Sequence, residues 1–285
     1  MANRVAEPMA VEIETPSGKG AGDENFPVGS ILIARRFWPH VMRFYTFARA
    51  ADDIADNPAL APDEKIQRLD AFEAGLAIGA TAPESAVILR DSLVATGVSD
   101  RHARNLLAAF RQDAVKQRYA NWSELLAYCA VSAHPVGRYL LDLHGEPIAT
   151  HGPSDALCAA LQVLNHLQDC GEDLRELNRV YLPEDWMVEA GIDVTALDAA
   201  EASPGLRRVI DRCLAGCDRL LDRSEPLSGI IRARRLAAEV AVIQRLARRL
   251  AARLRRQDPL ASRVRHSRLD VLAGLSAGLG RLVRL

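Results

Sequence analysis

The sequence predicts an all-α fold, a single helical bundle around a central apolar cavity. From Asp23 onward, nearly every segment has apolar residues at helical spacing. Alanine and leucine are abundant, and the alternation of β-branched residues that marks strands is scarce. Two aspartate clusters lie inside these apolar stretches. Residues four apart share a helix face, so two facing helices of this kind would place four carboxylates in one cavity.

Length and composition fit one domain that follows a short arm. Residues 1–22 are rich in Gly, Pro and charge without periodicity, so we expect a flexible N-terminal arm. Residues 23–285 suffice for one large core. The net charge of -1 gives no general attraction to nucleic acid, which is therefore not an expected partner.

Proline, glycine and serine residues divide the chain into roughly ten predicted helices with no strand. Ser99 and Ser154 are predicted N-caps, the latter for a helix that runs to Gln168. Breaks are predicted at Asn57-Pro58, Ala61-Pro62, Ala82-Pro83, Gly97, His151-Gly152-Pro153, Leu182-Pro183, Gly191, Ser203-Pro204 and Asp258-Pro259.

The first aspartate cluster closes a predicted helix before Pro58. Tyr45, Asp52 and Asp56 are spaced to lie close to one face, and Arg49 lies on the neighbouring stripe. The alternative is an acidic surface turn. Acids at a helix C-terminus oppose the helix dipole, which favours a functional role for this cluster.

A proline and a glycine interrupt the middle of the chain between Tyr128 and Arg138, which predicts a kink or break. The small residues there, Gly137 beside Val136, would let a ligand approach the backbone. Close packing between two helices explains them equally well. His134 is a candidate pocket residue.

The second cluster is a polar stripe inside an apolar helix, formed by Gln162, Asn165, Asp169 and Asp173. Amide and carboxylate groups in such a place need partners. His166 is predicted to point off this stripe and to be structural.

Beyond this helix lie Arg179 and Tyr181. An arginine fork suits phosphate, so Arg179 is a candidate for a diphosphate oxygen. A salt bridge from Arg179 to Asp173 or Glu172 is the alternative.

Carboxylate and amide oxygens are hard ligands that suit Mg²⁺, which commonly shares its shell with substrate phosphates. The predicted ligands are Asp52, Asp56, Asn165, Asp169 and Asp173, and two or three ions are expected through a substrate diphosphate. No nucleotide-binding glycine motif is present, so NADPH is not expected.

The five cysteines form no metal-site spacing, and no signal peptide or long apolar run is evident. These observations predict a cytoplasmic protein. From Arg245 to Leu285 there are eleven arginines and two acids, with leucines interleaved. One interpretation is a solvated helix face. The other is a basic amphipathic end that rests on an anionic membrane, a peripheral contact on the inner face.

With these residues in hand, the chain resembles the squalene/phytoene synthase family from about Asn25 to Arg265. The matching segments are Tyr45, Arg49 and residues 52–56, residues 128–137, residues 162–173 and residues 179–183. The resemblance implies the all-α class I isoprenoid synthase fold and the Mg²⁺ ligands given above. It further implies that Tyr45, Arg49, Arg179 and Tyr181 border the substrate diphosphate and that Phe26, Tyr128, Val136, Gly137 and Gln162 belong to the substrate pocket.

Residues 24–30 and 132–138 look most like the hopanoid-pathway branch of that family. The resemblance implies ionisation of presqualene diphosphate, rearrangement and water capture to give hydroxysqualene, with functional coupling to a presqualene diphosphate synthase. Head-to-head condensation of two farnesyl diphosphates, to presqualene diphosphate, squalene or a phytoene-type product, is the alternative. A head-to-tail elongase fits less well, since Asn57-Pro58 stands where paired arginines are expected. A non-catalytic lipid-binding helical protein would not need two aspartate clusters.

Overall fold

The computed structural model describes residue 14 and residues 33–77 and 82–283, and within them it confirms the all-α prediction. The β pairing found in this part is one isolated bridge between Tyr119 and Pro183. The α-helices are α1 (Trp38–Asp56), α2 (Pro62–Gly75), α3 (Glu84–Thr96), α4 (Arg101–Val115), α5 (Trp122–Ser132), α6 (His134–Leu143), α7 (His151–Gln168), α8 (Cys170–Leu177), α9 (Glu184–Glu189), α10 (Pro204–Ser224), α11 (Leu227–Ile230), α12 (Arg234–Leu254) and α13 (Arg268–Val283). Two short 3-10 helices, η1 (Ile148–Thr150) and η2 (Val194–Asp198), complete the described elements.

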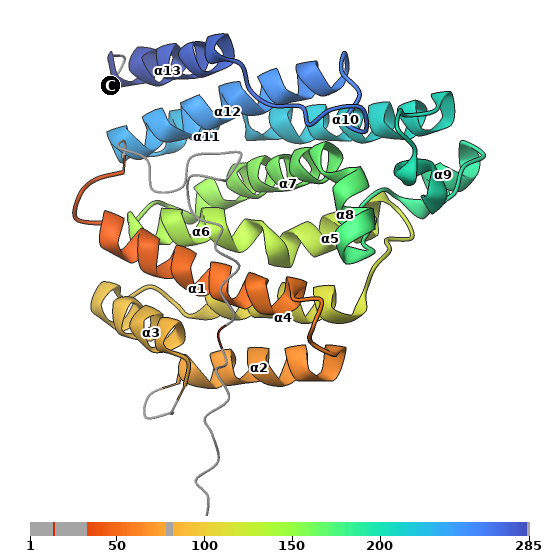
Figure 1. Cartoon of the computed structure of the whole chain (residues 1–285). Helices are drawn as coiled ribbons and strands as arrows, with labels where there is room; N and C mark the ends of the chain where they lie inside the picture. The colour runs from red at the N-terminus through yellow and green to blue at the C-terminus, as the bar shows by residue number, and fades with distance from the viewer. Residues whose placement is uncertain (1–13, 15–32, 78–81, 284–285) are drawn as a thin grey trace, which may run out of the picture.

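The helices stack in layers (Figure 1). Helices α2 and α3 lie at one end, followed by α1 with α4, then by α5 to α8, and then by α10 to α12. Helix α13 lies at the opposite end and packs on α12. No helix in the described ranges is both long and apolar enough to cross a membrane.

Buried apolar residues in the described chain form two cores. The N-terminal core joins α1 to α4 and one side of α6, with Phe47, Phe72 and Leu107 fully buried. The C-terminal core is built mainly by α5 and by α7 through α12, with Leu125 and Leu164 fully buried. Leucine and alanine supply most of both cores, as helix propensity and the predicted apolar stripes require.

Most of the predicted breaks agree with the structure. Helix α1 ends at Asp56, two residues before Pro58, and the predicted break near residue 134 separates α5 from α6 at Ala133. Thirteen described α-helices exceed the roughly ten predicted, because short helices such as α9 and α11 have too few residues to show a period.

The prediction of Ser154 as an N-cap is wrong. Helix α7 already starts at His151, and Pro153 is its third residue, where a helix needs no backbone donor. Ser99 lies one residue before the N-cap Asp100, although its hydroxyl accepts a hydrogen bond from the Arg101 backbone at 3.2 Å.

The predicted N-terminal arm, residues 1–22, lies mostly outside the described residues, and so does Phe26. Glu14 of the arm is described, and its carboxylate accepts hydrogen bonds from the Ser85 backbone (3.1 Å) and hydroxyl (2.7 Å). These acceptors serve the first turn of α3, whose backbone donors lack partners inside the helix.

Candidate active site

A cleft of about 280 Å³ lies where the two cores meet, close to the lower limit for small-molecule pockets. Helices α1 and α4 form one wall, and α5 to α8 with the following segment form the other. The lining residues are Tyr45, Ala48, Arg49, Asp52, Asp56, Leu106, Phe110, Asp113, Tyr128, Ser132, Val136, Gln162, His166, Asp173, Leu177, Arg179 and Tyr181. Residues from both predicted clusters therefore share one cavity.

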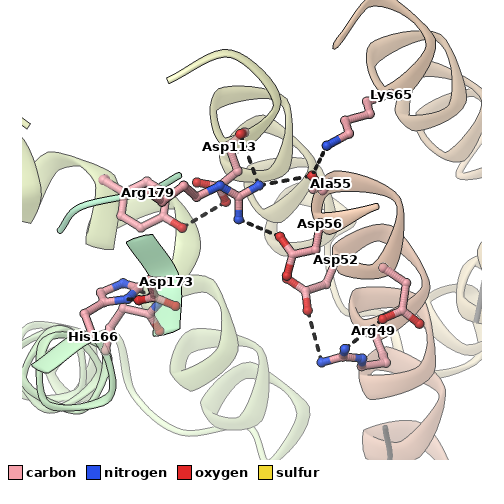
Figure 2. Close-up of polar contacts among 12 residues, drawn as sticks. Arg49, Asp52, Ala55, Asp56, Lys65, Asp113, His166, Asp173 and Arg179 are labelled. Carbon is pink, nitrogen blue, oxygen red and sulfur yellow. Dashed lines mark hydrogen bonds and ion pairs between the residues drawn. The ribbon is translucent and has the colours of Figure 1, made fainter. Parts of the chain in front are cut away.

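The first cluster divides between the cleft and the protein interior. Asp52 and Asp56, four residues apart on α1, both line the cleft (Figure 2). Asp53 is buried instead. The guanidinium of Arg49 joins the two orientations, because it lies 3.1 Å from Asp52 and 2.7 Å from Asp53. Arg49 thus neutralises part of the negative charge of this helix end.

The surroundings of Asp52 disfavour its charged form. Burial raises the pKa of Asp52 well above its ordinary value, and the charge of Asp56 raises it further. Arg49 opposes both effects without cancelling them. About a third of the Asp52 side chain faces the cleft, so a cation placed there would relieve this repulsion.

Arg179 is the cation that crosses the cleft. Its guanidinium donates to the Asp56 carboxylate at 2.5 Å and to the backbone carbonyls of Ala55 and Asp113 at 3.0 and 3.1 Å. The sequence predicted either a diphosphate oxygen or a nearby acid as the partner of Arg179. It did not predict Asp56, which lies on a helix far away in the chain. Lys65 also donates to the Ala55 carbonyl, at 2.7 Å. Two cations therefore complement the C-terminal dipole of α1, where the acids alone would oppose it.

Local backbone geometry places Arg179. Helix α8 ends at Leu177 and is capped by Asn178, whose φ of 52° is left-handed, a conformation that asparagine tolerates better than most residues. Arg118 holds this turn through the Asn178 side chain at 2.8 Å. The Val180 backbone then donates to the Gln117 carbonyl at 2.9 Å. The segment that carries Arg179 and Tyr181 is thereby tied to the end of α4.

The second cluster is not one continuous stripe. Helix α7 ends at Gln168 and α8 starts at Cys170, with Asp169 at the junction in a non-helical conformation. Asp173 lines the cleft, whereas Asp169 pairs with Arg263 at 3.1 Å and is not among the lining residues. Burial raises the pKa of Asp169, and Arg263 opposes that shift. Asn165 likewise lies outside the lining set.

Asp113 is a cleft residue that sequence reasoning missed. It lies on α4, accepts a hydrogen bond from the Tyr128 hydroxyl at 2.9 Å, and leaves its other carboxylate oxygen buried with no hydrogen-bond partner in the structure. Burial raises its pKa to about 7, although Arg179 pulls it down. It is a single acid in an amphipathic helix, so no motif in the sequence distinguishes it.

The prediction that His166 points away from the polar stripe is wrong. Its Nδ1 lies 3.7 Å from an Asp173 oxygen, and its ring stacks on Tyr181 with 3.5 Å between centroids. Its Nε2 lies 3.1 Å from the Gln162 amide nitrogen. The sequence did contain a signal for this placement of His166. A spacing of four residues from Gln162 puts both side chains on one face of α7, and both line the cleft.

The remaining sequence candidates divide clearly. Tyr45, Tyr128, Val136, Gln162 and Tyr181 line the cleft. Gly137 packs against α7 instead, because a Cβ there would lie 2.5 Å from the Ser154 hydroxyl and 2.6 Å from the Cys158 sulfur. Helix packing rather than ligand approach explains this glycine. His134 lies 3.8 Å from Asp155 and is not a lining residue.

The donor set of the cleft fits a hard divalent cation. Carboxylates reach it from α1 and α4 on one side (Asp52, Asp56 and Asp113) and from α8 on the other (Asp173). Within the described residues no three His, Cys, Asp or Glu side chains converge closely enough to form a complete metal site. The protein therefore offers partial coordination from two sides, which suits Mg²⁺ that keeps water and substrate oxygens as ligands.

Comparison with known sequences matches this chain to one protein family. The sequence model of squalene/phytoene synthase matches residues 20–270. A hydroxysqualene synthase of Rhodopseudomonas palustris is 46% identical over 97% of this chain and 95% of its own length. A hydroxysqualene synthase of Zymomonas mobilis is 44% identical over 93% of this chain and 91% of its own length.

Solved structures agree with the sequence comparison. The squalene synthase HpnC of Alicyclobacillus acidocaldarius superimposes with a TM-score of 0.72 and 31% identity, over 81% of this chain and 87% of that one. A dehydrosqualene synthase superimposes with a TM-score of 0.75 over 92% and 93% of the two chains. Its 20% identity supports the fold alone.

Proposed function

Since the chain belongs to the squalene/phytoene synthase family, we propose that it is an enzyme that converts presqualene diphosphate to hydroxysqualene and diphosphate. One observation carries the proposal. Three relatives named hydroxysqualene synthase are 44–46% identical to it over at least 88% of the chain. By comparison, a phytoene synthase of Rhodobacter capsulatus is 32% identical over 71% of the chain, and one of Solanum lycopersicum is 28% identical over 71%.

The proposal assigns metal binding to the carboxylates of the cleft. Asp52 and Asp56 would hold Mg²⁺ from one side and Asp173 from the other, with Asn165 and Asp169 as the further predicted ligands. Asp169 would first have to leave its pair with Arg263. Two or three bound ions would supply Lewis-acid stabilisation of the leaving diphosphate. The repulsion between Asp52 and Asp56 supports this assignment.

The two arginines would bind the diphosphate directly. Arg49 and Arg179 lie on the cleft beside the carboxylates, and guanidinium groups form charge-assisted, bidentate hydrogen bonds to phosphate oxygens. Arg179 is buried, and one of its two terminal nitrogens donates to two backbone carbonyls, so the position of the guanidinium is fixed before any substrate arrives. Its other terminal nitrogen, which donates to Asp56, would turn to the diphosphate when Asp56 holds Mg²⁺. Fixed donors stabilise developing negative charge without a cost of reorganisation at the moment of reaction.

The apolar lining would protect the cation. Leu106 and Phe110 of α4, Val136 of α6 and Leu177 of α8 line the cleft, so three different helices contribute. Such a wall excludes bulk water, so the carbocation left after C–O cleavage can rearrange before capture. One water then adds to the cation, and the released diphosphate accepts its proton.

Head-to-head condensation of two farnesyl diphosphates is the second candidate. The 31% identity to the solved squalene synthase and the relatives named phytoene synthase favour it. Both candidates use the same metal site and differ in the reaction after ionisation. A squalene product would also require a reductive step, for which NADPH is not expected.

Product analysis separates the two candidates. The purified protein with Mg²⁺ would receive presqualene diphosphate or farnesyl diphosphate in separate reactions, analysed by mass spectrometry. Hydroxysqualene from the first and no product from the second would support the proposal. Presqualene diphosphate or squalene from farnesyl diphosphate would move the protein to the condensing branch.

The proposal includes a cellular setting. All five cysteines are free, as a reducing compartment requires, which supports a cytoplasmic location. The substrate is itself the product of a condensing enzyme, so we propose functional coupling to a presqualene diphosphate synthase.

A further inference from the structure

Helix α13 presents its large apolar side chains to solvent. Leu269, Leu272, Leu279 and Val283 are 74%, 60%, 63% and 85% exposed, and Val271 and Leu275 are nearly half exposed. A surface helix ordinarily turns such residues toward the core. A contiguous apolar face of this kind on a protein surface marks a site of contact with another molecule or a membrane.

Close packing on α12 fixes this orientation. The inner face of α13 carries Gly274 and Gly278, and a Cβ at Gly278 would lie 2.7 Å from Val242. A helix turned by half a rotation would have to fit leucines into that space. The outward apolar face is therefore a consequence of how α13 docks on α12.

Polar contacts hold both ends of α13 in the same orientation. At its start, the buried Asp270 accepts hydrogen bonds from Arg253 at 2.5 Å and from the Ser267 backbone at 2.8 Å. Near its end, Arg281 donates to the Gly229 carbonyl at 3.1 Å and Arg234 donates to the Leu282 carbonyl at 2.7 Å. The inner face thus carries the polar anchors, and the outer face is left apolar.

The surroundings of this face are cationic. Asp270 is the sole acid from Pro259 to the end of the sequence, and it is buried and paired. Arg265 and Arg268 are exposed at the start of α13, and Arg245 is exposed on α12 beside the residues that α13 covers. Across the described chain, these three arginines have no acidic partner within ion-pair distance.

We propose that α13 docks on the surface of an anionic phospholipid membrane, with its leucines in the acyl region and the neighbouring arginines at the headgroups. An apolar helix face bordered by cations without acids is the combination that such a surface binds. A second copy of the chain fits less well, because a symmetric interface would bring together cationic margins that have no acids to pair with them.

Vesicle flotation tests the proposal. The full chain is mixed with vesicles of phosphatidylglycerol and phosphatidylcholine in equal parts, or of phosphatidylcholine alone. We expect flotation with the anionic vesicles that weakens as salt is raised. The double variant Leu272→Ser/Leu279→Ser should partition at least about tenfold less, because two exposed leucines no longer enter the acyl region.

Matched variants separate this effect from general loss of apolar surface. Ile148→Ser/Val188→Ser removes two side chains that are 75% and 76% exposed on other elements, and it should float like the unaltered chain. Arg265→Gln/Arg268→Gln should lose about an order of magnitude or more of the preference for anionic vesicles, since each cation near the surface contributes about fivefold.

Three results would overturn the proposal. They are no flotation of the unaltered chain, equal flotation of the Leu272→Ser/Leu279→Ser variant, or a dimer in light scattering that this variant converts to a monomer without any vesicle binding. The last result would assign the face to a second copy of the chain. Turnover of detergent-dispersed substrate is a separate measurement, so a failure here leaves the proposed reaction untouched and the reverse also holds.

Discussion

Replacement of Asp113 by asparagine should stabilise the metal-free protein at alkaline pH. The Asp113 carboxyl is buried in the cleft wall, and its pKa is raised from 3.8 to about 7. Because the pKa is higher in the folded protein than in the unfolded chain, ionisation of Asp113 lowers the free energy of unfolding. This loss is absent below about pH 4, grows as the pH rises and is complete above about pH 7. Asparagine keeps an oxygen for the Tyr128 hydroxyl and carries no charge.

The size of the effect follows from the shift. About three pKa units at 1.36 kcal/mol each amount to about 4 kcal/mol at pH 8, as an upper limit, and to less than about 2 kcal/mol at pH 5, where Asp113 is protonated in the folded protein. For a chain of this length, each kcal/mol shifts the midpoint of thermal unfolding by about 2–4 °C. Asp113→Asn should therefore raise the midpoint by several degrees at pH 8 and by less than half as much at pH 5.

Thermal unfolding followed by circular dichroism, in EDTA at both pH values, measures this difference. Asp198→Asn is the matched control, because it makes the same chemical change at an exposed position and should leave the midpoint unchanged. A midpoint for Asp113→Asn that is lower than that of the unaltered protein at pH 8, or a gain that is equal at the two pH values, would refute the reasoning.

Three further substitutions test other parts of the structure. Asp52→Asn should lower Mg²⁺-dependent turnover more than about 100-fold with an unchanged circular dichroism spectrum, because the loss of even an outer-shell partner of a metal costs about 10–100-fold; near-normal turnover would remove Asp52 from the metal site. Arg179→Met leaves Asp56 without its cation in a largely buried pair, so urea unfolding should show a loss of about 3–5 kcal/mol, and a loss below about 1 kcal/mol would mean that the pair is not effectively buried. Gly278→Val should destabilise the protein by about 1–3 kcal/mol through overpacking against α12. Gly280→Ala is the control and should not destabilise it, because nothing lies within 4 Å of a Cβ at that position. Equal effects of the two substitutions in thermal unfolding would contradict the close approach of α13 to α12.

The sequence was sufficient for the fold class and for the polar residues that α1 contributes to the cleft. Helical spacing alone places Asp52 and Asp56 on one face of α1, and the structure has them side by side on the cleft. The break near Pro135 was equally readable, because proline and glycine act on the local backbone.

What sequence reasoning could not supply was tertiary context. The stripe through Asp169 assumed a continuous helix, but the junction between α7 and α8 turns this residue toward Arg263. Asp113 and His166 belong to the cleft through the packing of α4 and α7 against other helices, and no local pattern encodes such packing. The Asp56 partner of Arg179 could not be found either, because it lies 123 positions away in the chain.

The division of the molecule into two cores gives the cleft a mechanical role. Asp52 and Asp56 are built on the N-terminal core, whereas Asp173 and the segment of Arg179 are built beside the C-terminal core. Without a ligand, the ion pair between Arg179 and Asp56 connects the two cores across the cleft. A ligand that binds to both acidic walls at once links the two cores, so its binding free energy adds to the stability of their association. Amide hydrogen exchange in α1 and α8 should then slow together when such a ligand binds, although the two helices belong to different parts of the sequence.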